Sequence, residues 1–383
     1  MTRHNKKYSA TRPAGLISRI IGVIAFVVTL IISIGFTSSA WSGMVSPLTN
    51  RIAPIWAMTF SGWFALMFVV FVIDLIWWRR CAIMAFLSIL VCLPQVWDFC
   101  PVNLPKGKMS EEQSRRAFTL MTYNVLQFHN QDTAYSKDYN EALQYIISQQ
   151  PDIVCLEEAP HLRPTAKINI TPLQIDTLVK TYPYMYFHNS ELAFFSKYEA
   201  ESIPINFPTM KYGSGEIAGW RINKDGTVIN VFVVHLRSFQ LSPTLRDLWR
   251  EITTPDAADA KYIEEARKEL TPLIVRASKD RALQAQWIES MLRKYGGENT
   301  IVCGDFNDLE NSYPVNYLVD NCNLQQTYPK VGLGPMITYN SSHFYFRIDH
   351  ILYRGKIKPY SMRRGNIKAS DHYPLIATFL VDK

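Results

Sequence analysis

The stretch Ile301-Val302-Cys303-Gly304-Asp305-Phe306-Asn307-Asp308 decides the fold. It begins with apolar, β-prone residues, stops at a glycine and continues with two acids that flank Phe306 and Asn307. A buried strand that ends in a short polar run delivers carboxylates to one edge of a sheet, where open α/β sheets keep their chemistry. The octapeptide alone is equally consistent with a strand followed by an ordinary Asp/Asn turn. Other strand ends along the chain carry the same kind of residue, and this favours the first interpretation.

The segments around this stretch alternate between strand and helix patterns. Residues 140–150, for example, place Ala142, Leu143, Ile146 and Ile147 at helical spacing. The pattern predicts strands over residues 118–124, 153–156, 192–198, 215–223, 228–236, 300–303, 346–353 and 373–381, and helices over residues 140–150, 257–270, 281–295 and 313–318. We therefore expect an α/β fold.

Charge is distributed unevenly along the 383 residues. Residues 1–100 carry eight basic and two acidic side chains, whereas the remaining 283 residues carry 32 basic and 31 acidic ones. The net charge of +7 therefore reflects the flanks of apolar segments and does not indicate a surface for a polyanion. The six cysteines form no CxxC pair, so the sequence indicates neither a zinc site nor a disulfide framework.

Three apolar segments precede the α/β part. Residues 15–36 and 53–78 are long enough to span a bilayer, and residues 81–97 are of marginal length. A signal peptide is the alternative for the first segment, since Ser38-Ser39-Ala40 loosely resembles a cleavage site. The two further apolar segments argue against simple secretion. We expect a membrane anchor of about three helices in residues 1–99, a linker in residues 100–116 and an α/β domain in residues 117–383.

Basic residues predict the orientation in the membrane. Five of them lie in residues 1–19, the loop over residues 41–54 contains only Arg51, and Arg79-Arg80 follow two tryptophans. We expect the N-terminus inside and the 41–54 loop outside. Three spans then place residues 100–383 outside the cytoplasm, in a multi-pass protein of a bacterial-type inner (plasma) membrane. If the third segment only lies in the membrane, the domain is cytoplasmic instead.

Acids, amides and histidines gather at the predicted strand ends. They are Asn124, Glu158, His235, Asp305, Asn307, Asp349, Asp371 and His372. The chain shows no G-x-S-x-G, P-loop or H-E-x-x-H pattern. Oxygen ligands from Glu, Asp and Asn suit Mg²⁺, Mn²⁺ or Ca²⁺ rather than zinc, and Mg²⁺ is the first choice. The matching reaction is attack of a metal-organised water on a phosphate ester, with His and Asn donors at the phosphoryl oxygens.

The order of these motifs resembles the endonuclease/exonuclease/phosphatase superfamily over residues 117–382. The matching segments are Thr122-Tyr123-Asn124, the run from Pro151 to Glu158, Val234-His235-Leu236, Gly304-Asp305-Phe306-Asn307, Arg347-Ile348-Asp349-His350 and Ser370-Asp371-His372. The resemblance implies a four-layer α/β sandwich, in which two packed mixed β-sheets are flanked by helices. The family usually has Gln-Glu where this chain has Glu157-Glu158.

The resemblance also implies a role for each residue. Glu158 is expected as the principal metal ligand, with Asn124 beside the metal and phosphate and Asp371 in the metal site or against His372. Catalytic roles fall to five residues: Asp305 orients or deprotonates the attacking water, Asn307 holds phosphate and water in line, His235 and His372 donate to phosphoryl oxygens, and Asp349 orients a histidine. Glu157 is interpreted as an acid at the surface or behind the ligands, and His350 as a packing residue.

The implied activity is a metal-dependent hydrolase that acts on a phosphodiester or phosphomonoester. The expected partners are the membrane and a phosphate-ester substrate, either nucleic acid or a phospholipid head group. Three alternatives remain: a nuclease acting on DNA or RNA near the membrane, a sphingomyelinase-like phospholipid hydrolase, and a non-catalytic membrane interaction protein. The insertion over residues 237–277, with Leu241, Leu245, Leu248 and Trp249, is interpreted as a lid, a second membrane contact or a surface helix pair.

Overall fold

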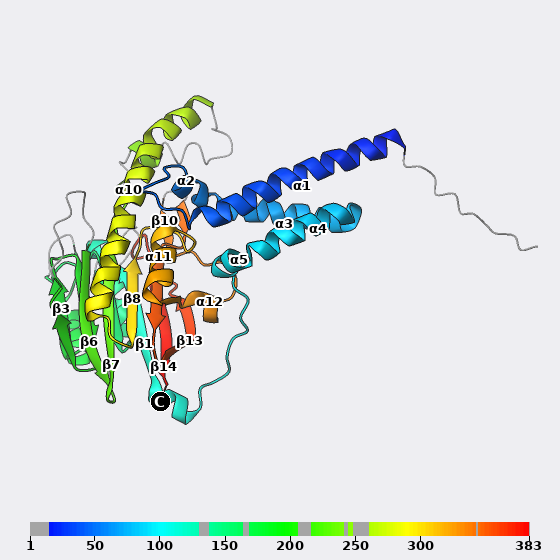
Figure 1. The fold of residues 1–383 in the computed structure, drawn as a ribbon. Helices are drawn as coiled ribbons and strands as arrows, with labels where there is room; N and C mark the ends of the chain where they lie inside the picture. Colours follow the sequence, from blue (N-terminus) through cyan, green and yellow to red (C-terminus); the bar gives the residue numbers. More distant parts are fainter. Residues whose placement is uncertain are drawn as a thin grey trace, which may run out of the picture. The chain divides into compact units, whose positions relative to one another are not determined.

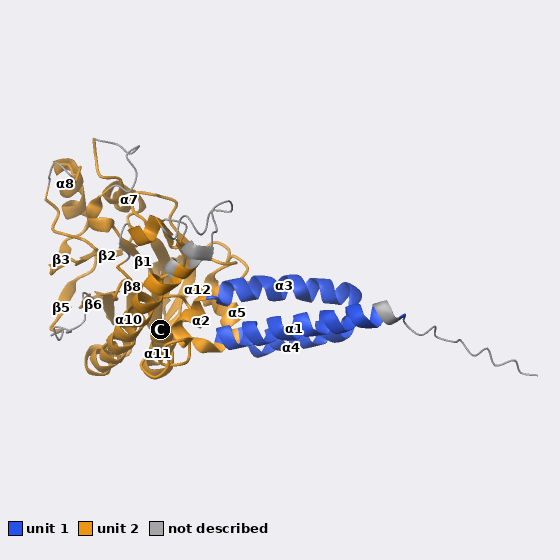
Figure 2. Cartoon of the chain, turned by 90° about the horizontal axis from the view of Figure 1, so that it is seen from above, with its two compact units in different colours: residues 1–40, 59–93 blue, residues 41–58, 94–383 orange. Residues whose placement is uncertain are grey.

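The computed structural model describes residues 15–129, 138–163, 168–205, 216–240, 244–247, 260–341 and 344–382. The chain forms two compact units (Figure 2). Residues 1–40 and 59–93 make up the first unit, and residues 41–58 and 94–383 make up the second. Of the insertion residues named above, Leu241, Leu248 and Trp249 lie outside the described part.

Apolar helices make up the first unit. It contains most of α1 (Leu16–Ser42), α3 (Phe60–Trp77) and α4 (Arg79–Val91). Ser18–Ser42 and Phe60–Trp77 are long and apolar enough to cross a membrane, and α4 with α5 (Leu93–Phe99) forms a third candidate that bends by 71°. The buried Thr29 hydroxyl donates a hydrogen bond to Asp74 at 2.7 Å. The acidic side chain of Asp74 therefore has a polar partner among the apolar helices.

The second apolar segment differs from the single helix expected over residues 53–78. It is divided at Thr59 into α2 (Ala53–Met58) and α3, and α2 belongs to the second unit. Asn50 begins α2, since its side chain accepts hydrogen bonds from the backbone N–H groups of Ile52 and Ala53 at 2.9 and 3.1 Å. α2 then packs against the long helix α10 (Ala260–Tyr295) of its own unit.

Two mixed six-stranded sheets form the centre of the second unit (Figure 1). The strands of the first sheet are, in order, β13 (Ile357–Arg364), β14 (Leu375–Val381), β1 (Ala117–Asn124), β2 (Ile153–Glu157), β4 (Leu192–Ser196) and β3 (Tyr184–His188). Those of the second are β5 (Ala200–Ile203), β6 (Glu216–Lys224), β7 (Thr227–His235), β8 (Thr300–Asp305), β12 (Asp349–Arg354) and β9 (Gln325–Gln326). A separate hairpin pairs β10 (Tyr339–Ser341) with β11 (Phe344–Phe346).

Alternation along the strands creates the layers. In β1, Phe118 and Leu120 enter the core between the sheets, whereas Met121 and Tyr123 pack outward under α7 (Glu141–Gln149) and α8 (Pro172–Thr181). On the other sheet, α10 and α11 (Tyr313–Cys322) cover a third apolar core. The order helix, sheet, sheet, helix confirms the expected four-layer α/β sandwich.

Several elements differ from the sequence prediction. The helices expected over residues 257–270 and 281–295 are one 36-residue helix, α10, which continues through Pro272. The basic stretch over residues 356–364 forms the edge strand β13, whose position at the rim leaves its lysines and arginines in solvent. The remaining short elements are η1 (Leu126–Phe128), α6 (Glu111–Arg116) and α12 (Tyr328–Val331).

The segment expected as a linker lies along the α/β domain. Asn103 donates to the carbonyls of Pro329 and Gly332 at 3.1 and 2.8 Å, and the Tyr360 hydroxyl donates to the Gly107 carbonyl at 2.6 Å. Trp97 of α5 also donates to the Pro329 carbonyl, at 2.9 Å. Residues 97–107 are therefore fixed to the domain by backbone carbonyls that sequence patterns do not reveal.

Candidate active site

Strand pairing brings the predicted site residues to one edge of each sheet. In the second sheet, Asp305 of β8 pairs with His235 of the parallel strand β7 and with Asp349 of the antiparallel strand β12. In the first sheet, the parallel strands β1 and β2 pair Asn124 with Glu157, so Glu158 follows directly at the same edge. Both parallel pairs thus end where an α/β sheet usually binds its ligand.

Asn124 joins two carboxylates from different sheets. Its amide nitrogen lies 3.2 Å from Glu158 Oε1 and 3.1 Å from Asp305 Oδ2, and its amide oxygen accepts the Leu126 N–H at 3.1 Å. Burial raises the pKa of both carboxyl groups, and the opposing attraction comes from His235 for Glu158 and from His372 for Asp305. In this geometry the amide nitrogen of Asn124 holds the two acids together.

His372 is held between two acids. Its Nδ1 lies 2.9 Å from Asp349 Oδ2, and its Nε2 lies 3.5 Å from Asp305 Oδ2. Burial alone would lower the pKa of His372, but the charges of Asp349 and Asp305 raise it well above its usual value. The two carboxylates therefore favour the protonated imidazole, and Asp349 fixes the direction of its ring.

His235 has a matching partner that the sequence did not indicate. Its Nδ1 lies 2.5 Å from Glu191 Oε1, and its Nε2 lies 3.9 Å from Glu158 and 3.7 Å from Asp305. Burial acts to lower the pKa of His235, whereas the hydrogen bond to Glu191 and the charge of Asp305 raise it above its usual value. Glu191 sits in a turn just before β4, outside every motif, so no pattern in the chain marks it.

The turn after β8 shapes the polar end of the octapeptide. Gly304 has φ 137°, and a Cβ there would lie 2.0 Å from the Val234 carbonyl oxygen, so glycine is required where β7 and β8 meet. Asn307, at φ 51°, donates its backbone N–H to Asp305 Oδ1 at 2.8 Å and its side-chain amide to the Leu236 carbonyl at 3.0 Å. These bonds leave Asp305 Oδ2 directed at Asn124 and the histidines.

The last motif, Ser370-Asp371-His372, lies just before β14 of the first sheet and completes the group of site residues. Ser370 donates its hydroxyl to the Asn124 carbonyl at 2.8 Å and lies 3.3 Å from Asp371 Oδ1, while the His372 N–H donates to Ser370 at 3.2 Å. Asp371 and His372 both line the cavity described below. The structure thus brings all eight predicted residues to one region of the second unit.

Two flanking residues play structural parts. Glu157 is fully buried and accepts the Thr122 hydroxyl at 2.8 Å, and burial raises its pKa well above the usual value. This burial favours the neutral form of Glu157, and the glutamine usual in the family at this position is likewise neutral. His350 is also buried; its Nε2 lies 2.9 Å from the Asp308 carbonyl oxygen, and burial lowers its pKa to about 3, as suits a packing residue.

A family model described as "Endonuclease/Exonuclease/phosphatase family" matches residues 121–372. The chain belongs to this family. The match spans every motif from Asn124 to His372 and excludes the apolar helices.

The chain is also similar to several solved structures. They include truncated TDP2 from Caenorhabditis elegans, with 15% identity over 69% of this chain and 98% of that chain and a TM-score of 0.46. An endonuclease/exonuclease/phosphatase from Bacteroides vulgatus shows 18% identity over 70% of this chain and 99% of that chain, with a TM-score of 0.45. One from Beutenbergia cavernae DSM 12333 shows 15% identity over 70% of this chain and 72% of that chain, with a TM-score of 0.44. No curated protein matches the chain in sequence.

Members of the endonuclease/exonuclease/phosphatase family are typically divalent-metal-dependent phosphoester hydrolases, and the donor set fits such an ion. Carboxylates of Glu158, Asp305 and Asp371 face one cavity, and hard cations prefer oxygen ligands of this kind. Ligand atoms of Asp305, Asp349 and His372 also lie within 4.8 Å of one another. Both Asp349 oxygens, however, lie within 3.1 Å of His372 Nδ1, so this trio is arranged as a hydrogen-bonded chain.

The cavity of this family domain has a volume of about 230 Å³. Its inner end carries Glu158, His235, Asp305, Asn307, Asp371 and His372. Its remaining lining is largely apolar and comes, apart from Ile348, from segments without any motif: Met58, Leu126, Phe239, Phe344 and Phe346, with Tyr339, Ser238, Gln240 and Arg246 among them. The Tyr339 ring packs edge-on against His372 at a centroid distance of 4.9 Å. Sequence patterns identified the inner end and missed this outer lining.

Proposed function

We propose that this chain is a membrane-anchored phosphoesterase that hydrolyses a phosphodiester or phosphomonoester by attack of an activated water. One observation carries the proposal. Asp305 Oδ2 has three proton-donating groups around it, the Asn124 amide at 3.1 Å, His372 Nε2 at 3.5 Å and His235 Nε2 at 3.7 Å. A buried carboxylate with two imidazoles beside it, each held at Nδ1 by a second acid, offers a proton acceptor and two proton donors within one cavity, as phosphoryl transfer requires.

The residues then take the following parts. Asp305 orients the attacking water and takes its proton, while Asn307 helps to hold water and phosphate in line. His235 and His372 donate from Nε2 to phosphoryl oxygens as negative charge develops there. Glu191 and Asp349 hold these two rings in position through Nδ1. Asn124 keeps Glu158 and Asp305 at a fixed separation.

We assign Glu158 as the main ligand of a divalent cation, with Asp371 and Asn124 near it. The ion is Mg²⁺, with Mn²⁺ or Ca²⁺ as substitutes, since all of these prefer oxygen ligands. When bound, such an ion supplies Lewis-acid stabilisation of the phosphoryl group. The Asn124 oxygen already accepts the Leu126 N–H and its nitrogen holds Glu158, so we expect Asn124 to contribute mainly through its hold on Glu158.

The full chain, purified with Mg²⁺ and assayed on bis(p-nitrophenyl) phosphate, tests this proposal. Asp305→Asn should lower kcat by about 10²–10⁴-fold, because it removes the proton acceptor and retains the shape. Glu158→Gln should weaken Mg²⁺ binding, measured by calorimetry, together with activity. Asp320→Asn is the matched control, since Asp320 is exposed on α11. An Asp305→Asn enzyme as active as the Asp320→Asn control would refute the proposal.

The substrate class is tested by comparing plasmid DNA, RNA and phospholipid vesicles in the same assay. Apolar side chains in the outer lining and a membrane anchor favour an ester presented at a membrane surface over free nucleic acid. Nuclease activity is the second candidate, because aromatic side chains such as Phe344 also stack on bases. If no phosphate ester is hydrolysed in the presence of any divalent metal ion, the result favours the alternative of a non-catalytic membrane interaction protein.

We place the domain outside the cytoplasm of a bacterial-type inner membrane. Support comes from the basic N-terminal flank and from residues 41–58, which follow the first candidate span and belong to the same compact unit as the α/β domain. Segments in one compact unit lie on one side of the membrane. Reporter fusions at residue 383 test this placement, and activity of a cytoplasm-only reporter would reverse it.

A further inference from the structure

The segment over residues 41–58 is built into the catalytic unit although it lies outside the family match. Gly43 is buried against the turn that follows the site residues Asp305 and Asn307. A Cβ on Gly43 would lie 1.6 Å from the Asn311 carbonyl oxygen and 3.2 Å from the Asn316 amide nitrogen. Such a close approach of two backbones is possible only for glycine.

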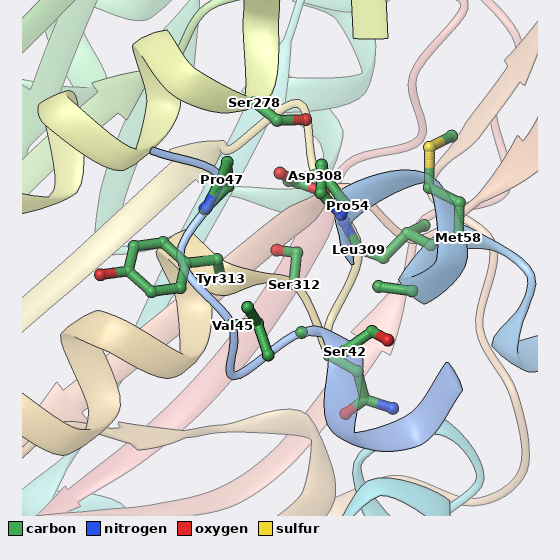
Figure 3. Close-up of a pocket in the computed structure, with 13 residues that line it drawn as sticks. Ser42, Val45, Pro47, Pro54, Met58, Ser278, Asp308, Leu309, Ser312 and Tyr313 are labelled. Atoms are coloured by element: carbon green, nitrogen blue, oxygen red, sulfur yellow. The ribbon is translucent and has the colours of Figure 1, made fainter. Parts of the chain in front are cut away.

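The same turn fits closely against the rest of the segment. Figure 3 shows Val45, Pro47, Pro54 and Met58 around Asp308, Leu309 and Tyr313. The space left between these groups is about 10 Å³, close to the least that one water molecule needs. Asn311, itself buried, also donates to the Gln95 carbonyl at 3.0 Å. The turn is thus packed against two membrane-proximal segments.

This packing directs one side chain into the catalytic cavity. Asn50 fixes the start of α2, and α2 ends at Met58, which lines the cavity that also holds Glu158, Asp305 and His372. Phe239, Phe344 and Phe346 line the cavity from other elements. A flexible thioether beside aromatic rings adapts well to an apolar group of variable shape.

We propose that residues 41–58 complete the substrate pocket, and that Met58 sets a preference for phosphate esters that carry an apolar group. This inference rests on the proposed phosphoesterase function. The proposed role of Met58 requires glycine at position 43, because the close contact of Gly43 with Asn311 determines where α2 and Met58 lie. The segment between the first two candidate spans is thereby a specificity element of the enzyme as well as a connection.

Two phosphodiesters that share a leaving group test the role of Met58 in the full chain with Mg²⁺: methyl and octyl p-nitrophenyl phosphate. The wild type should prefer the octyl ester. Met58→Ser should lower the octyl-to-methyl ratio of kcat/KM by about tenfold, because it replaces an apolar contact with a polar one. Met58→Leu, of similar volume and polarity, should retain the ratio.

A glycine pair tests the packing. Gly43→Ala forces the segment away from Asn311 and should reproduce the loss of octyl preference. Gly62→Ala is the matched control, because a Cβ at Gly62 meets nothing within 4 Å. If Met58→Ser and Gly43→Ala both keep the wild-type ratio while the methyl ester is turned over, this inference is overturned and the proposed function stands. If the wild type hydrolyses neither these diesters nor any phosphomonoester, the proposed function itself fails.

Discussion

The inner end and the outer lining of one cavity are built in opposite ways. The inner end consists of charged and amide side chains at or just after the ends of β2, β7 and β8 and just before β14, each held by at least one hydrogen bond or ion pair. The outer lining consists mainly of apolar side chains from α2, the hairpin β10–β11 and the residues after β7. The first region is a rigid polar network, whereas the second is a collection of contacts from separate loops.

This difference assigns the two regions different tasks. A buried polar network keeps its geometry, because displacement of one member leaves the others without partners. Such rigidity suits the positioning of water and phosphate. Loops can change side chains without disturbing the sheets, so they suit substrate selection. Substitutions at the inner end should therefore lower kcat, and substitutions in the outer lining should change KM and substrate preference.

The largest effect expected from this comparison is that of Asp349→Asn. Asparagine keeps the shape and a hydrogen bond to His372 but removes the charge that raises the pKa of this histidine. We expect kcat to fall by about 10²-fold. The protonated form is the donor, so activity is present below the pKa of His372 and is lost as the pH rises through it. The alkaline limb of the kcat profile should therefore move to lower pH in this variant.

A pH profile separates this role from a merely structural one. Loss of folding would lower kcat at every pH without moving the limb. A limb at the wild-type position, with kcat reduced, would show that Asp349 does not act through the charge of His372.

Glu191→Gln should have a smaller effect of the same kind. The Glu191 side chain is 29% exposed, compared with 3% for Asp349, so water screens its interaction with His235. We expect kcat to fall by about tenfold, with little change in KM for a small ester. Glu201→Gln, on an exposed position of β5, is a control of equal chemistry. A loss as large as that of Asp349→Asn would contradict the ranking by exposure.

Much of the inner end of the cavity could be predicted, because the pairing register of neighbouring strands fixes which residues lie side by side at the edge of a sheet. A parallel pair that ends in Asn124 and Glu157, and another that ends in His235 and Asp305, must place these groups at one edge. The four-layer sandwich followed from the same strand order and from the resemblance to the family.

The outer lining could not be predicted, since its members meet only in three dimensions. Met58 was assigned to a membrane span, because its neighbours are as apolar as those of a helix in lipid. Its true place depends on the contact between Gly43 and Asn311, which are 268 positions apart in the chain. Glu191 was missed for a related reason: it follows a turn whose residues show no periodicity.

The hairpin β10–β11 allows the outer lining to be tested with a matched neighbour. Phe344 and Phe346 line the cavity, whereas Tyr345 points to the other face of the strand and is 54% exposed. Phe344→Ala should raise KM for an ester with an apolar group by about threefold to tenfold and leave kcat unchanged, because it removes contact area and no charge. Tyr345→Ala should change neither constant. A fall in kcat for Phe344→Ala, with KM unaltered, would instead place this ring among the groups that position the reacting phosphate, and the division between the two regions of the cavity would no longer hold.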